Sequence, residues 1–258
     1  MGRLRELGSI YARIGRTYRS WAPALLLLAT IVFVPVGLLD ALTFHADLES
    51  LDLEHSLKLL AVIAATAAIT ITALLGEVFY AGAVAVSLTH PEHGQAPPLR
   101  EIAARLNYGR LIGIDLVYGL IVTVGLTLLI APGVAAFVWL GLAGPIVEIE
   151  DRSVRGAFTR SAQLIRHRFW MVLLVLVPIE IAGDAIVSAI AEVVHGALGH
   201  TLLATWLADS AGNILFTPFF AIAAVLLTLD LIAEKDGTGP VLNPSPTPIA
   251  SASAPASA

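Results

Sequence analysis

Long apolar runs, separated by short charged segments, dominate the pattern of the chain. A helix needs about 20 apolar residues to cross a hydrocarbon core of roughly 30 Å. Six stretches approach or meet that length, at 21–39, 59–89, 111–130, 134–147, 170–194 and 206–231. The pattern therefore predicts an all-α, polytopic membrane protein with six transmembrane helices in a single domain, residues 1–235.

The fourth stretch, 134–147, is the shortest of the six. At about 1.5 Å per residue it reaches only about 21 Å. It follows Ala131-Pro132-Gly133, a sequence typical of a turn. We expect this Pro-Gly to form an outer hairpin turn, after which the fourth helix either borrows flanking residues or lies where the bilayer thins.

Positive charges fall in alternate loops, which predicts the orientation. Of the 15 Lys and Arg residues, 14 precede the first span, lie between spans two and three or four and five, or follow the sixth. Only Lys58 lies elsewhere. Because cytoplasmic loops retain Lys and Arg, both termini are predicted to be cytoplasmic.

Composition supports membrane insertion and excludes several other classes. Hydrophobic residues make up 57% of the 258 residues and charged residues 14%, against roughly 45–50% and 25% in soluble domains. The net charge of −5 argues against a nucleic-acid partner, and the absence of cysteine excludes a disulfide or thiolate-metal scaffold. The Pro-, Ser- and Ala-rich segment 236–258 is predicted to be a disordered cytoplasmic tail.

Three arginine-bearing segments carry apolar residues at helical spacing, at 3–20, 99–109 and 152–168. They are predicted to be amphipathic helices that lie in the membrane interface, where they either orient the spans or recognise anionic lipid. The candidate contacts to anionic headgroups are Arg152, Arg155, Arg160, Arg166 and Arg168.

Polar side chains inside the spans form the candidate functional site. Glu180 lies ten residues beyond Trp170, about 15 Å along a helix and so near the membrane midplane. The fifth and sixth spans each carry a polar stripe, and we expect the two stripes to face each other or a shared cavity. Such a site would hold a proton or cation, or its members would join the helices by hydrogen bonds. The candidate residues are Glu77, Glu180, Asp184, Ser188, Asp209 and Asn213.

Known catalytic motifs are absent from the sequence. It contains no Gly-rich phosphate loop, no HExxH zinc motif and no G-x-S-x-G nucleophile elbow. We therefore predict no catalytic residue, metal ligand or cofactor.

The region 132–170 resembles a known bacterial family. The residues that carry the resemblance are Pro132, Gly133, Trp139, Pro145, Glu148, Glu150, Asp151, Ala157, Ser161, Arg166, Phe169 and Trp170. They are similar to the membrane domain of glycerophosphoryl diester phosphodiesterases and to its stand-alone, YciC-like relatives. The resemblance implies a multi-pass protein of the bacterial plasma membrane whose molecular role is undefined. In the fused enzymes a separate soluble barrel carries the phosphodiesterase chemistry, and this sequence has no motif of that barrel.

Two functions follow from these patterns. The first is a non-enzymatic accessory protein or lipid-associated scaffold, whose partners are the bilayer, anionic headgroups on the cytoplasmic side, and a second copy or another membrane protein. The alternative is a small proton- or cation-coupled transporter that uses the intramembrane carboxylates of spans five and six.

Overall fold

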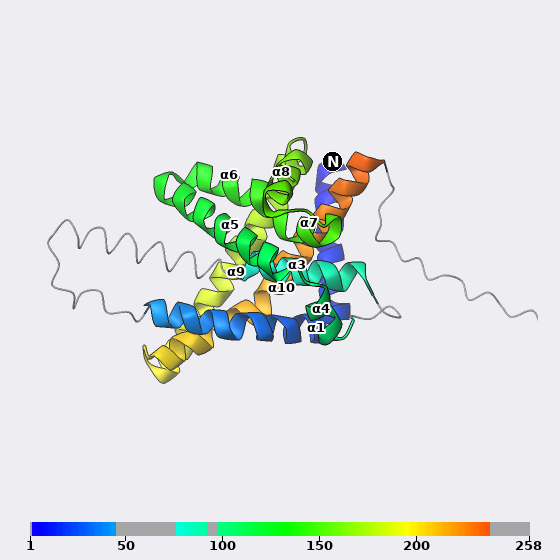
Figure 1. Ribbon diagram of the computed structural model, residues 1–258. Helices are drawn as coiled ribbons and strands as arrows, with labels where there is room; N and C mark the ends of the chain where they lie inside the picture. The colour runs from blue at the N-terminus through cyan, green and yellow to red at the C-terminus, as the bar shows by residue number, and fades with distance from the viewer. Residues whose placement is uncertain (1, 45–75, 92–96, 238–258) are drawn as a thin grey trace, which may run out of the picture.

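The computed structural model describes residues 2–44, 76–91 and 97–237, and within these ranges the protein is all-helical (Figure 1). The predicted start of the second span at 59–75 and most of the predicted tail, from 238 on, lie outside the described residues. The helices are α1 (Gly2–Phe44), α3 (Glu77–Thr89), α4 (Leu99–Arg105), α5 (Tyr108–Leu128), α6 (Ile130–Leu140), α7 (Ala143–Glu150), α8 (Val154–Ile165), α9 (Phe169–Leu198) and α10 (Leu202–Asp236).

Five helical stretches of the described chain are long and apolar enough to cross a membrane. They are Arg5–Leu39, Tyr108–Leu128, Ile130–Glu150, Phe169–Leu198 and Leu202–Asp236. The predicted multi-pass helical architecture is thus confirmed. The described part of the predicted second span is α3, which has 13 residues.

The outward faces of these helices are apolar as well as the inward ones. Large side chains more than half exposed on α1, α5 and α9 include Leu27, Ile31, Ile112, Leu116, Leu120 and Ile181. Helices that are apolar all round are typical of membrane spans, because lipid rather than water covers their outer faces.

Helix α3 lies at the centre of the molecule, packed against α7, α10 and α5 (Figure 1). Small residues allow this close packing. A Cβ on Gly82 would lie 2.6 Å from Leu111 Cδ2, and one on Gly144 would overlap the Val78 carbonyl oxygen. Gly82 of α3 and Gly144 of α7 therefore allow α3 to approach its neighbours closely.

Helices α5 and α6 form a hairpin, but the chain reverses at Leu129 and not at the predicted Pro132-Gly133. Leu129 has extended backbone angles, φ −159° and ψ 137°, and α6 begins with the next residue. Pro132 falls in the first turn of α6, where proline is tolerated because its missing N–H has no partner there. Gly133 packs on α5, where a Cβ on Gly125 would lie 2.8 Å from Gly133 Cα.

The returning stretch is longer than the predicted fourth span. It runs from Ile130 to Glu150, with a short break at Gly141 and Leu142 between α6 and α7. Its 21 residues are about the length that a span requires. The helix therefore borrows flanking residues on both sides.

Helix α1 has two arms that point in different directions in Figure 1, and both arms run antiparallel to α10. Arg13 pairs with Asp230 near the end of α10, whereas the Trp206 indole N–H near its start donates to the Val34 carbonyl at 2.9 Å. Within the predicted amphipathic segment 3–20, the apolar stripe packs inward, since Ile10 and Ile14 are 5% and 2% exposed.

The arginine-bearing segments gather at one end of the molecule. In Figure 1 the N-terminus, α4, α8 and the end of α10 lie to the right of the view, whereas the end of α1 and the turns α5–α6 and α9–α10 lie to the left. We call the first of these the basic end, comprising residues 5–20, 99–110, 150–168 and 230–237. This grouping is the one that the alternation of charged loops predicts.

Candidate functional site

The start of α3 is fixed by a buried aspartate from another helix. Gly76, just before α3, has φ +96°, a left-handed conformation that favours glycine. Asp115 of α5 is 3% exposed and accepts hydrogen bonds from the backbone N–H groups of Gly76 at 2.5 Å and Val78 at 3.2 Å. Asp115 therefore satisfies N–H groups that no carbonyl within α3 can reach.

Glu77 is the first residue of α3, and it lies within electrostatic range of three other acids, Asp115 of α5 and Glu180 and Asp184 of α9. Glu77 is 8% exposed. The hydroxyl of Tyr118, one turn beyond Asp115, is fully buried in the field of the same acids. Of the predicted site residues, the structure thus brings Glu77, Glu180 and Asp184 together.

Helices α9 and α10 carry the two predicted polar stripes. These helices meet through glycines, because a Cβ on Gly183 would lie 2.5 Å from Phe216 Cδ1 and one on Gly212 would lie 2.8 Å from Val187 Cγ2. A glycine facing a bulky side chain brings the helices closer than two polar side chains would.

The remaining predicted site residues are Ser188 of α9 and Asp209 and Asn213 of α10. Ser188 is exposed, and Asp209 and Asn213 are half-buried on α10. That the stripes of α9 and α10 face each other or a shared cavity therefore stays a prediction.

Ion pairs connect the segments of the basic end. Arg160 of α8 binds Glu150 of α7 through Nη2 at 2.7 Å and Nε at 2.9 Å, and it reaches Asp236 at 3.4 Å. Arg152 also binds Glu150, at 3.0 Å. Hydrogen bonding to Glu150 raises the pKa of Arg160 above its ordinary value, so this guanidinium stays charged.

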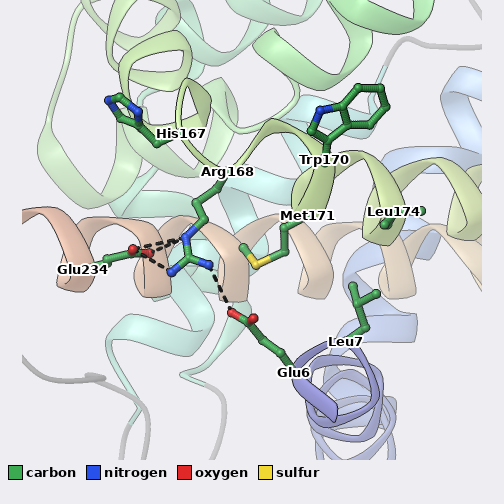
Figure 2. Close-up of a pocket in the computed structure, with 8 residues that line it drawn as sticks. All are labelled: Glu6, Leu7, His167, Arg168, Trp170, Met171, Leu174 and Glu234. Atoms are coloured by element: carbon green, nitrogen blue, oxygen red, sulfur yellow. Dashed lines mark hydrogen bonds and ion pairs between the residues drawn. The ribbon is translucent and has the colours of Figure 1, made fainter. Parts of the chain in front are cut away.

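A second group of ion pairs surrounds Arg168 at the start of α9. Figure 2 shows its guanidinium between Glu234 of α10, at 2.7 Å, and Glu6 of α1, at 3.5 Å. Hydrogen bonding to Glu234 raises the pKa of Arg168. These groups border a pocket of about 330 Å³ with Leu7, His167, Trp170, Met171 and Leu174. Arg168 therefore connects the N-terminal arm of α1 to α9 and α10.

The five arginines predicted to contact lipid fall into two sets. Arg152, Arg160 and Arg168 bind carboxylates of the protein itself. Arg155 and Arg166 are exposed and form no ion pair with any residue that the structure describes. That the five contact anionic headgroups stays a prediction, and three of them also pair with acids of α7, α1 and α10.

Other structural residues carry no local sequence signal. Glu148 accepts a hydrogen bond from the Asn107 backbone N–H at 3.0 Å and so caps α5 from a distance of 41 residues. Asp115 and Tyr118 lie on α5 within electrostatic range of Glu77, outside the two predicted polar stripes. The sequence singles out Asp115 only because a carboxylate within a span is energetically costly and therefore needs a structural or functional reason.

The long apolar helices define a multi-pass helical membrane protein. In the described part of the chain, no group of three or more His, Cys, Asp or Glu side chains is arranged to hold a metal ion. Searches with the sequence and the structure find no matching family model, no matching curated protein and no matching solved structure.

Proposed function

We propose that the protein is a non-enzymatic, lipid-associated membrane scaffold whose basic end faces the cytoplasm and binds anionic lipid headgroups. The observation that carries this proposal is the division of the basic residues into an ion-paired set and an unpaired, exposed set. The proposal retains the six-span topology, with α3 as the described part of the second span. We also propose that the protein is related to the stand-alone relatives of the phosphodiesterase membrane domain.

The paired arginines make the basic end a connected platform. Arg13, Arg160 and Arg168 join the N-terminal arm of α1, α7, α8 and α9 to α10. The pairs Arg13–Asp230 and Arg160–Glu150 are half-buried, and separating them would leave a charge without a partner. The pairs of Arg168 with Glu6 and Glu234 are exposed and contribute less.

The unpaired basic residues extend over the outside of this platform. They are exposed and form no ion pair among the described residues, and they are Arg5, Arg16, Arg19, Arg100, Arg155, Arg166 and Lys235. Each basic residue near an anionic membrane surface contributes about 1 kcal/mol to its attraction. Seven such residues at one end favour a membrane leaflet rich in anionic lipid.

The test compares thermal stability in nanodiscs of zwitterionic lipid with that in nanodiscs that contain anionic phosphatidylglycerol. We expect the wild-type protein to gain stability from the anionic lipid. The double variant Arg155→Gln/Arg166→Gln keeps the wild-type Tm in zwitterionic lipid and loses part of that gain. The matched variant Arg160→Gln, from the paired set, has a lower Tm in both lipids. A wild-type Tm that is the same in the two lipids would overturn the proposal.

A second candidate function is a small proton- or cation-coupled transporter, favoured by the buried Glu77 and by the acids Glu180 and Asp184 within electrostatic range of it. Its test is flux of protons or monovalent cations in vesicles containing the purified protein. Unchanged flux in Glu180→Gln/Asp184→Asn would exclude it.

A further inference from the structure

The pocket beside Arg168 lies where α9 enters its membrane-spanning stretch. That stretch begins at Phe169, directly after Arg168. Trp170 and Leu174 line the pocket and are 70% and 48% exposed, so lipid rather than protein covers their outer sides. Tryptophan is typical of the boundary between headgroups and hydrocarbon. The pocket therefore opens at the depth where a lipid headgroup meets its acyl chains.

The second wall of the pocket is the N-terminal arm of α1, which contributes Leu7. This arm is fixed to α9 by a hydrogen bond next to the pocket. Pro178 has no N–H to donate to the Leu174 carbonyl four residues before it. The Tyr11 hydroxyl donates to that carbonyl instead, at 2.9 Å. The bond holds the two walls in a fixed relation to each other.

Charged groups of both signs line the polar side of the pocket. They are the carboxylates of Glu6 and Glu234 and the guanidinium of Arg168, and together these three groups carry one negative charge. His167 also lines the pocket, and an imidazole has an N–H donor in either protonation state. This combination suits a ligand that carries a positive and a negative group, and it disfavours one that is only anionic.

The contact between Arg168 and Glu6 leaves a donor and an acceptor available to such a ligand. Glu234 occupies Nε and Nη2 of Arg168, at 3.1 and 2.7 Å. The third nitrogen, Nη1, lies 3.5 Å from the Glu6 carboxylate, beyond the roughly 2.7–3.2 Å of an ordinary hydrogen bond. Figure 2 shows this looser contact beside Leu7, with Glu234 on the other side of the guanidinium.

We propose that the pocket binds one zwitterionic aminophospholipid, with the lipid phosphate on Nη1 of Arg168 and the lipid ammonium on the carboxylate of Glu6. Leu7, Trp170 and Leu174 contact the first part of the acyl chains. The inference goes beyond the proposed function, which places anionic lipid on the unpaired arginines, and it holds whether or not that function is correct.

The size and chemistry of the pocket select this headgroup. Its volume of about 330 Å³ is near the lower limit of about 300 Å³ for ligand pockets, so it holds a headgroup with the start of its chains and not a whole lipid. A primary ammonium has three N–H donors for a carboxylate. A choline group has none, and a glycerol headgroup carries no positive charge to offset the two carboxylates.

The experiment is native mass spectrometry of the purified full-length protein in detergent, with phosphatidylethanolamine and phosphatidylcholine of identical acyl chains in competition. We expect the first bound lipid to be phosphatidylethanolamine with a preference of about fivefold, the value of one exposed ion pair of about 1 kcal/mol. Glu6→Gln should abolish this preference. Glu101→Gln is the matched control, because Glu101 is an ion-paired acid of the basic end outside the pocket, and it should keep the preference.

Equal binding of the two lipids by the wild-type protein would overturn the proposal, and this result requires no variant to fold. A preference that survives in Glu6→Gln would also overturn it, as would displacement of the bound lipid by an equal concentration of soluble phosphoethanolamine. The variant Arg155→Gln/Arg166→Gln should keep the preference for phosphatidylethanolamine while it loses bound phosphatidylglycerol. The failure of the scaffold function is thereby distinguished from the failure of this site.

Discussion

Replacing Asp115 with alanine should detach the start of α3 from α5. The change leaves the N–H groups of Gly76 and Val78, now 2.5 and 3.2 Å from the carboxylate, without an acceptor in a water-free interior. Each buried donor left unsatisfied costs about 1–3 kcal/mol, so the two together give about 2–6 kcal/mol. Removing the buried acid offsets part of this cost, and we expect a net loss of about 3 kcal/mol.

Asp115→Asn is the graded variant. Its carbonyl oxygen still accepts one N–H, whereas its amide N–H₂ faces the other donor, so we expect a loss of about 1–2 kcal/mol. Val117→Ala is the matched control on α5, because Val117 is 38% exposed and faces outward. Its free energy of unfolding should change by less than about 0.5 kcal/mol.

The assay is equilibrium unfolding in mixed micelles, followed by far-ultraviolet circular dichroism, with hydrogen exchange at the first amides of α3 as a local measurement. The order of stability should be wild type and Val117→Ala, then Asp115→Asn, then Asp115→Ala. If Asp115→Ala is as stable as Val117→Ala, the aspartate does not hold the start of α3 and the reasoning is refuted.

Three further predictions concern packing, ion pairs and transport. Gly144→Ala should destabilise the fold by about 1–3 kcal/mol in the same assay, because its Cβ overlaps the backbone of α3, whereas Gly8→Ala, which has open space around it, should not. Arg160→Gln should cost about 1.5–3 kcal/mol, since the half-buried partner carboxylate on α7 loses its charged hydrogen bonds; a change below about 0.5 kcal/mol would show that the pair is only a surface contact. For the scaffold function, Glu180→Gln/Asp184→Asn should leave proton flux in vesicles at the wild-type level, and a loss of flux would favour the transporter.

The positions of the spans and the basic end could be predicted because they depend on the period and charge of local sequence. The length of an apolar run decides whether a helix can cross the membrane, and four of the five long stretches lie where a predicted span lies or extend it. The fifth, Arg5–Leu39, merges the predicted interfacial segment with the first span into one helix. A local pattern does not show whether a helix continues through a polar-to-apolar boundary.

The positions of the turns depend on details that periodicity does not contain. Pro132-Gly133 is typical of a turn, yet proline also suits the first turn of a helix and glycine also suits a close helix crossing. In the structure, Pro132 lies in the first turn of α6 and Gly133 lies where α6 crosses α5 closely. Similarly, Gly76 separates two apolar runs that read as one span, because its left-handed conformation is stabilised by Asp115, 39 residues away.

The sequence could predict which residues belong to the candidate site, but not which of them lie close to one another. Glu77, Glu180 and Asp184 stand out because an acid within a span is costly. Their meeting depends on α3 packing in the centre of the molecule, and that arrangement follows from tertiary contacts of Gly82 and Gly144. The same holds for the arginines of α8, whose partners on α7 and α10 cannot be read from the amphipathic pattern.

Cysteine accessibility tests the central claim, that the basic end faces the cytoplasm, most directly. The natural chain has no cysteine, so single cysteines can be placed at Gln163, exposed on α8, and at His200, exposed in the α9–α10 turn. With a membrane-impermeant maleimide, His200→Cys should react in intact cells, and Gln163→Cys should react only after the membrane is permeabilised. Labelling of Gln163→Cys in intact cells, with His200→Cys protected, would contradict the orientation and with it the proposed contact of the basic end with cytoplasmic anionic lipid.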